Sequence, residues 1–114
     1  MDHQQVEEYV LSMPNAVLTY PFGEDVAVYK IGTSSDAKMF ALIPEKKSPL
    51  QISLKCDPAL AVVLREKYET VLPGYHLNKK HWNTVILSGQ LPWEEVQGLI
   101  RLSYDLVNGT AAID

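Results

Sequence analysis

The pattern of apolar and polar residues divides the chain into helical and extended segments. Near the start, apolar side chains recur at the spacing i, i+3, i+4 and i+7, which predicts a helix over residues 2–13. Asp2 can cap this helix and Pro14 ends it. A second helix is expected to begin at Asp57-Pro58, and a third to run over about 92–107 and end at Asn108-Gly109. The residues of the first apolar stripe are Val6, Tyr9, Val10 and Met13.

Five segments have the length and composition of strands: 17–22, 26–31, 38–43, 50–56 and 84–87. Residues 50–56 alternate strictly between apolar and polar side chains, which predicts a half-buried strand with one face in solvent. The loops between the early strands are too short for crossover helices, so we expect antiparallel pairing. The order α-β-β-β-β-α-β-α predicts a two-layer α+β domain with an antiparallel five-stranded sheet and three helices.

Length and composition point to one domain over residues 1–114, with 46% hydrophobic and 21% charged residues. No apolar run approaches the roughly 18 residues that span a bilayer, and the N-terminus has no signal-peptide pattern. The single cysteine, Cys56, excludes an internal disulfide and fits a reducing compartment. We therefore expect a cytoplasmic protein with no membrane partner.

The net charge of −4 argues against nucleic acid, because nucleic-acid-binding domains are usually basic. The charge is unevenly distributed, however. Residues 1–37 carry six acids and one base, and residues 82–114 carry four acids and one base, whereas residues 38–81 carry eight bases and four acids. The middle of the chain can therefore present a basic face under an acidic total, or its lysines can be scattered and serve only solubility.

The most distinctive polar segment is residues 73–82, which join the second helix to the last predicted strand. This segment holds two histidines, two lysines, an asparagine and two aromatic residues behind a Pro-Gly turn. Loops rich in specific side chains commonly form binding surfaces. Its candidate ligand-contacting residues are Tyr75, His76, Asn78, Lys79, Lys80 and His81, joined by Lys55 from the polar side of residues 50–56.

The chain resembles the MmcQ/YjbR-like family of small bacterial proteins. The resemblance is spread in the family's order over nearly the whole chain, and the PGYH-x-NKxHW block is highly specific. It implies an α+β fold like that of the bacterial frataxin CyaY, and a likeness to double-wing DNA-binding proteins. The residues that carry it are Tyr20-Pro21-Phe22-Gly23, 38–42, 54–58, 73–82 and 103–107.

Two chemical readings of the polar segment receive little support from the residues. His76 and His81 are five residues apart rather than four, and with one cysteine they match no recognised zinc pattern. Cys56 could pair with a histidine as a nucleophile, but the alternation places it on the apolar side, where a thiol is inert. We therefore expect a non-enzymatic protein without a metal or another cofactor.

The sequence favours a DNA-binding protein. Lys55, Lys79 and Lys80 would neutralise phosphates, while His76, Asn78 and His81 would orient the loop or bond the ligand. Tyr75 could stack on a base, and Trp82 would anchor the loop in the core. One alternative is a protein-interaction or chaperone-like module that uses an exposed sheet face. Another is a small-ligand or metal site at His76 and His81.

Overall fold

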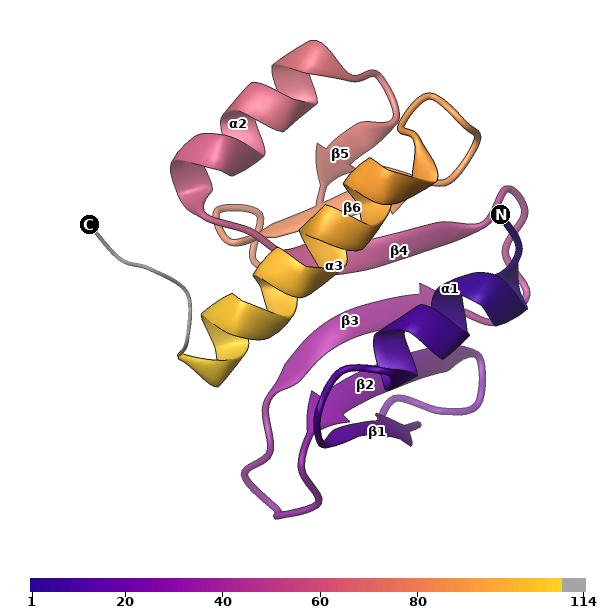
Figure 1. Ribbon diagram of the computed structural model, residues 1–114, viewed down its shortest axis with the longest axis vertical. Coiled ribbons are helices and arrows are strands. Elements are labelled where there is room, and N and C mark those ends of the chain that lie inside the picture. Colours follow the sequence, from indigo (N-terminus) through magenta and orange to yellow (C-terminus); the bar gives the residue numbers. More distant parts are fainter. Residues whose placement is uncertain (110–114) are drawn as a thin grey trace.

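The helices lie on one side of an antiparallel sheet, as Figure 1 shows. The computed structural model describes residues 1–109, and within that range the sheet has six strands in the order β1-β2-β3-β4-β6-β5. The predicted α+β class and the antiparallel pairing are confirmed. Along the chain the elements are α1 (His3–Leu11), β1 (Ala16–Thr19), β2 (Val26–Ile31), β3 (Met39–Pro44), β4 (Gln51–Lys55), α2 (Pro58–Lys67), β5 (Val71–Pro73), β6 (Trp82–Ile86) and α3 (Trp93–Asn108).

The predicted number of strands was wrong, because the described chain contains six rather than five. The missed strand is β5 (Val71–Pro73), which is only three residues long and ends in a proline. Proline cannot donate a ladder hydrogen bond, but it is tolerated here because β5 is an edge strand. Two boundaries also differ: β1 ends at Thr19 instead of continuing past Pro21 to Phe22, and β6 begins at Trp82 instead of Thr84.

The predicted N-terminal caps of α1 and α2 are confirmed by their hydrogen bonds, whereas α1 ends at Leu11, two residues earlier than predicted. The Asp2 carboxylate accepts from the backbone N–H of Gln5 at 2.8 Å, and the Asp57 carboxylate accepts from the N–H groups of Ala59 and Leu60. These bonds satisfy amides that a helix leaves unpaired in its first turn. No helix within residues 1–109 combines the length and the apolar content that crossing a membrane requires.

The main core lies between the helices and the sheet. Ala27, Ile52, Leu54 and Val85 project from neighbouring strands towards this core and are nearly or fully buried. A register shift beside Tyr29 gives β3 an extra residue opposite β2, so that two successive β3 side chains, Phe40 and Ala41, both join the core. From α1 and α3 the core receives Val6, Val10, Val96, Ile100 and Tyr104.

The opposite side of the sheet, which we call the open face, is more apolar than predicted. Its central residues Val28, Leu42 and Trp82 form a second buried cluster. Gln51 and Ser53, which we expected in solvent, are only 9% and 6% exposed. The expectation of one solvent-exposed face for this strand was therefore wrong at these two positions, because the segment that follows β5 covers part of the open face.

Candidate functional site

The residues between β5 and β6, 74–81, form the central loop of the candidate site. A glycine starts this loop because the chain returns very close to itself there. The N–H of Gly74 donates to the carbonyl of Trp82 at 2.8 Å, and a Cβ on Gly74 would lie 2.7 Å from the Cβ of Trp82. Contacts that short do not occur between real Cβ atoms, so only glycine fits without displacing Trp82.

Two of the predicted ligand-contacting residues help to hold the loop in shape. The side-chain oxygen of Asn78 accepts from the N–H of Lys80 at 2.9 Å, which is the bond of an Asx turn. The Lys79 ammonium donates to the carbonyl of Gly74 at 3.0 Å, across the mouth of the loop. Both residues are exposed, so each keeps hydrogen-bonding capacity for a ligand.

An arginine from α2 ties the central loop to the helical layer. The Arg65 guanidinium donates to the side-chain oxygen of Asn83 at 2.7 Å and to the carbonyls of Lys79 and Trp82. These bonds direct the Arg65 guanidinium to the central loop and to the start of β6. A planar guanidinium suits this role, since its donors are arranged as a fixed fork.

The outer surface of the loop presents an exposed aromatic residue beside two cationic or ionisable groups. Tyr75 is 62% exposed, and the centre of its ring lies 4.0 Å from that of His76. The Lys47 ammonium lies 5.1 Å from the centre of the Tyr75 ring, within the range of a cation–π contact. His76 has a positive φ of 59°, a strained conformation that places its ring beside Tyr75.

Beneath this aromatic surface the open face contains a groove of about 430 Å³. That volume falls within the range of small-molecule pockets, which is about 300–1,000 Å³. The walls are mostly apolar, and the polar groups are a lysine, a histidine, a glutamine and a serine. The lining residues are Phe22, Val26, Leu42, Pro44, Lys47, Gln51, Ser53, Tyr75, His76 and Leu77.

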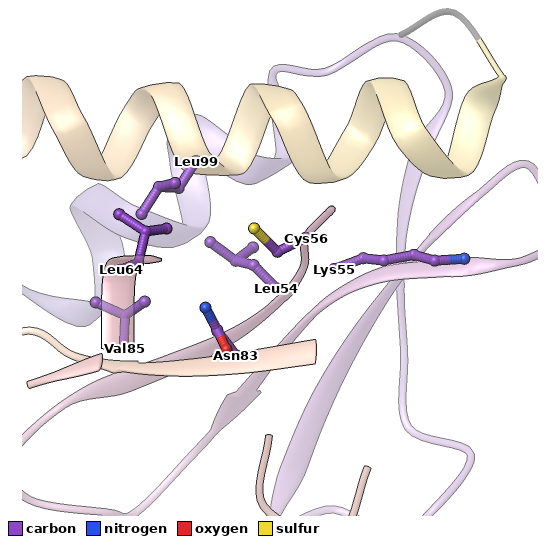
Figure 2. Close-up of a pocket in the computed structure, with 7 residues that line it drawn as sticks. All are labelled: Leu54, Lys55, Cys56, Leu64, Asn83, Val85 and Leu99. Atoms are coloured by element: carbon purple, nitrogen blue, oxygen red, sulfur yellow. The ribbon is translucent and has the colours of Figure 1, made fainter. Parts of the chain in front are cut away.

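The predicted binding residues therefore separate into groups. Tyr75 and His76 line the groove together, whereas Lys80 is exposed on the loop, and His81 and Lys55 are half-buried beside β6 and in β4. Figure 2 shows the Lys55 side chain extending away from the other residues that surround a small cavity under α2 and α3. That cavity, of about 10 Å³, holds at most one water molecule and is not a ligand site.

Cys56 belongs to the same internal region and is unsuited to nucleophilic chemistry. Its thiol is 4% exposed and faces apolar neighbours that include Leu54 and Leu99 (Figure 2). Burial, together with the nearby Asp57 carboxylate, raises the pKa of the Cys56 thiol to about 11. At neutral pH the thiolate is therefore scarce.

Sequence reasoning missed several residues of this site. Phe22 was assigned to a strand, but it lies beyond β1 and is 66% exposed at the groove. Lys47 lies in a charged loop between Pro44 and Pro49, and nothing in the sequence pattern indicated that it would contact Tyr75. Within residues 1–109, a separate group of side chains could bind a metal ion. It comprises His3, Glu7 and Glu45 and includes neither His76 nor His81. Its sequence signal was the four-residue spacing of His3 and Glu7.

Comparison with known proteins places the chain in a family. The family model described as YjbR matches residues 11–106. The uncharacterized protein YbdF of Escherichia coli O157:H7 is 34% identical over 105 residues, which are 92% of this chain and 83% of YbdF. The uncharacterized protein YjbR of Escherichia coli K12 is 42% identical over 66 residues, or 58% of this chain and 56% of YjbR.

Solved structures share the fold. The crystal structure of Deinococcus radiodurans protein DR2400, described as a DUF419 domain, has a TM-score of 0.89 and 38% identity, and the match covers 97% of this chain and 81% of that one. A Pseudomonas syringae crystal structure has a TM-score of 0.77 and 33% identity, with 94% and 99% covered. The matched span and the shared fold together establish that the chain belongs to the YjbR family.

Proposed function

We propose that this protein binds DNA through unpaired bases at the groove on the open face. The observation that carries the proposal is the aromatic surface of Tyr75 and His76, with the Lys47 ammonium above the Tyr75 ring. Exposed aromatic rings stack on bases, and adjacent ammonium groups neutralise phosphates. A duplex keeps its bases stacked on each other, so this surface favours single strands, ends or loops over continuous duplex.

The predicted residues and Lys47 take distinct roles in this proposal. Tyr75 and His76 contact bases, whereas Lys47 and Lys80 contact the phosphates on either side. Lys79 and Asn78 act through the loop, because their side chains already bond within it, and the donors that remain on Lys79 can reach a phosphate. Lys55 and His81 are half-buried and lie outside the groove lining. We assign them an accessory part.

The charge of the molecule supports binding that depends strongly on salt. The net charge is −4, but residues 38–81 carry the excess of bases. If about three phosphates are neutralised, log affinity falls against log salt concentration with a slope of roughly −2 for single strands and −3 for duplex. Affinity should therefore be highest at low ionic strength, and the stacking surface of Tyr75 and His76 should add a preference for single strands.

Fluorescence anisotropy with labelled single-stranded and duplex oligonucleotides, repeated over a salt series, tests this proposal. Tyr75→Ala should lose about 1–3 kcal/mol of binding free energy through lost stacking. Lys47→Ala should weaken binding and make the salt slope shallower by about 0.7. The matched control is Lys67→Ala, because the Lys67 ammonium lies 5.2 Å from the centre of the Tyr68 ring at the C-terminal end of α2, which is a similar pair away from the groove. Equal binding by the parent, Tyr75→Ala and Lys47→Ala, or no binding at low salt, would contradict the proposal.

A second candidate function is a protein-interaction module that uses the same groove. It is favoured by the apolar lining and by two large exposed aromatic residues at the groove, Phe22 and Tyr75. Aromatic side chains are enriched at the centres of protein interfaces. This candidate predicts a partner whose affinity changes little with salt and falls after Phe22→Ala. DNA binding instead predicts the steep salt dependence described above.

A further inference from the structure

A cluster of potential metal ligands lies where α1 meets the loop after β3. His3 and Glu7 are four residues apart on α1, which places both side chains on one face of the helix. Glu45, directly after β3, supplies the third group. One ligand atom from each of the three side chains lies within 4.8 Å of the others. The fold therefore brings together a nitrogen and two oxygen ligands from segments that are distant in sequence.

The geometry of the histidine is what a metal ligand requires. The Nε2 atom of His3 lies 3.4 Å from a carboxylate oxygen of Glu45. Two ligands of one tetrahedral zinc ion, each about 2.1 Å from the metal, are separated by about 3.4 Å. This Nε2 atom is shielded from solvent and has no hydrogen-bond partner among the described residues. A shielded ring nitrogen whose polar contact is a 3.4 Å approach to a carboxylate, without a hydrogen bond, is poorly satisfied, and a coordinated ion would satisfy it.

Both carboxylates are oriented by tyrosine hydroxyl groups. Tyr29 donates to Glu7 at 2.5 Å, and Tyr20 donates to Glu45 at 3.2 Å. Metal-binding carboxylates are commonly fixed by such outer hydrogen bonds. Each of these bonds uses one carboxylate oxygen, so the other oxygen stays available to an ion. Tyr29 is fully buried in the main core, which makes its support of Glu7 rigid.

Charge also favours a bound cation at this position. Within residues 1–109, no lysine or arginine forms an ion pair with Glu7 or Glu45, and the sole ionic contact in the cluster is that of His3 with Glu45. Two carboxylates and one imidazole carry a net negative charge at neutral pH. A divalent ion would neutralise this charge and link α1 to the loop that carries Lys47.

We propose that His3, Glu7 and Glu45 form a binding site for a divalent first-row transition metal ion. The mixed nitrogen and oxygen ligands suit Zn²⁺, Fe²⁺ or Mn²⁺ better than Ca²⁺ or Mg²⁺, which take all-oxygen sites. Three protein ligands leave at least one coordination position for water or another ligand.

Isothermal titration of the chelator-treated protein with Zn²⁺, together with native mass spectrometry, tests the site. We expect one zinc ion per chain. His3→Ala, Glu7→Gln and Glu45→Gln should each weaken binding by at least about tenfold, and Tyr20→Phe should have a smaller effect through the orientation of Glu45. The ligand substitutions lie at half-buried positions, so they should leave the fold intact, which circular dichroism checks.

Two matched controls keep the test specific. Glu8→Gln alters an exposed acid on the same helix, and His76→Ala alters a histidine of the central loop, so neither should change zinc affinity. The proposal is overturned if Zn²⁺ does not bind, or if His76→Ala abolishes binding. It is also overturned if affinity depends on His3 but on neither glutamate, since the ion would then be held by His3 and backbone groups alone.

Discussion

At the scale of the residue, the candidate site depends on a few side chains whose roles are determined by geometry rather than by type. Gly74 is required because a Cβ would collide with Trp82, and the Arg65 guanidinium binds the loop at Lys79 and the start of β6 at Trp82 and Asn83. The sequence identified Pro73-Gly74 as a turn, but the partner of Gly74 is set by the pairing of β5 with β6. Pairings of that kind are tertiary information, which periodicity does not contain.

The first prediction concerns Cys56 and the pH dependence of stability. The pKa of this thiol is about 11 in the folded protein, against an ordinary value of 9.0, because burial disfavours the thiolate. The unfolded chain therefore loses its proton first as pH rises. The stability that comes from keeping the thiol neutral is complete below pH 9 and is lost as pH rises through 11, by about 2 kcal/mol at pH 11.

Urea unfolding of the parent and of Cys56→Ala at a series of pH values measures this effect. The variant lacks the titrating group, so its stability should fall less steeply between pH 9 and 11, while other titrating residues affect both proteins alike. Parallel pH profiles for the two proteins would show that Cys56 ionises in the folded state as readily as in the unfolded state.

At the scale of the element, α3 holds β3 and β4 together, and these two strands share the shortest hydrogen-bonded ladder of the described sheet. The two strands share only the register pairs Ala41 with Leu54 and Leu42 with Ser53. Beyond them, the buried hydroxyl of Ser103 on α3 donates to the carbonyl of Phe40 and accepts from the N–H of Lys55. One side chain thus satisfies a backbone group of each strand. Only the packing of α3 against the sheet reveals these partners of Ser103, so the sequence alone could not predict them.

We therefore expect Ser103→Ala to be unusually destabilising for the loss of one hydroxyl. It leaves a buried carbonyl and a partly buried N–H without their partner, which corresponds to about 1–3 kcal/mol for each buried group left unpaired. Chemical denaturation measures the change. Ser12→Ala is the matched control, because the Ser12 hydroxyl also donates to a carbonyl, that of Tyr9, but is exposed. Similar stability losses for the two variants would contradict the role given to Ser103.

At the scale of the whole molecule, much of the fold was predictable from the sequence and the candidate site only in part. Helix caps, strand periodicity and the lengths of the loops between strands are local signals, so the α+β class and the antiparallel pairing followed from them. The groove joins Phe22, Lys47 and Tyr75 from three separate segments, and its formation depends on how the central loop folds over the open face. That arrangement also explains why Gln51 and Ser53 are buried although their alternation indicated solvent.

The last prediction concerns the open face, part of which the central loop covers. It compares two leucines on opposite sides of the sheet. Leu42 on the open face is 8% exposed, and Leu54, from the adjacent strand, is 2% exposed on the side of the helices. If the open face is a second core, Leu42→Ala should lower the free energy of unfolding by about 2–3 kcal/mol, while Leu54→Ala should lower it by about 3–5 kcal/mol. We expect the smaller loss of unfolding free energy for Leu42→Ala because Leu42 borders the groove, where neighbouring side chains and water can fill the space that the substitution leaves.

The control is Leu11→Ala, which alters an exposed leucine and should change stability by less than about 1 kcal/mol. A Leu42→Ala change as small as that of Leu11→Ala would mean that the central loop does not close over the sheet in solution. The groove on which the proposed DNA binding depends would then lack its wall.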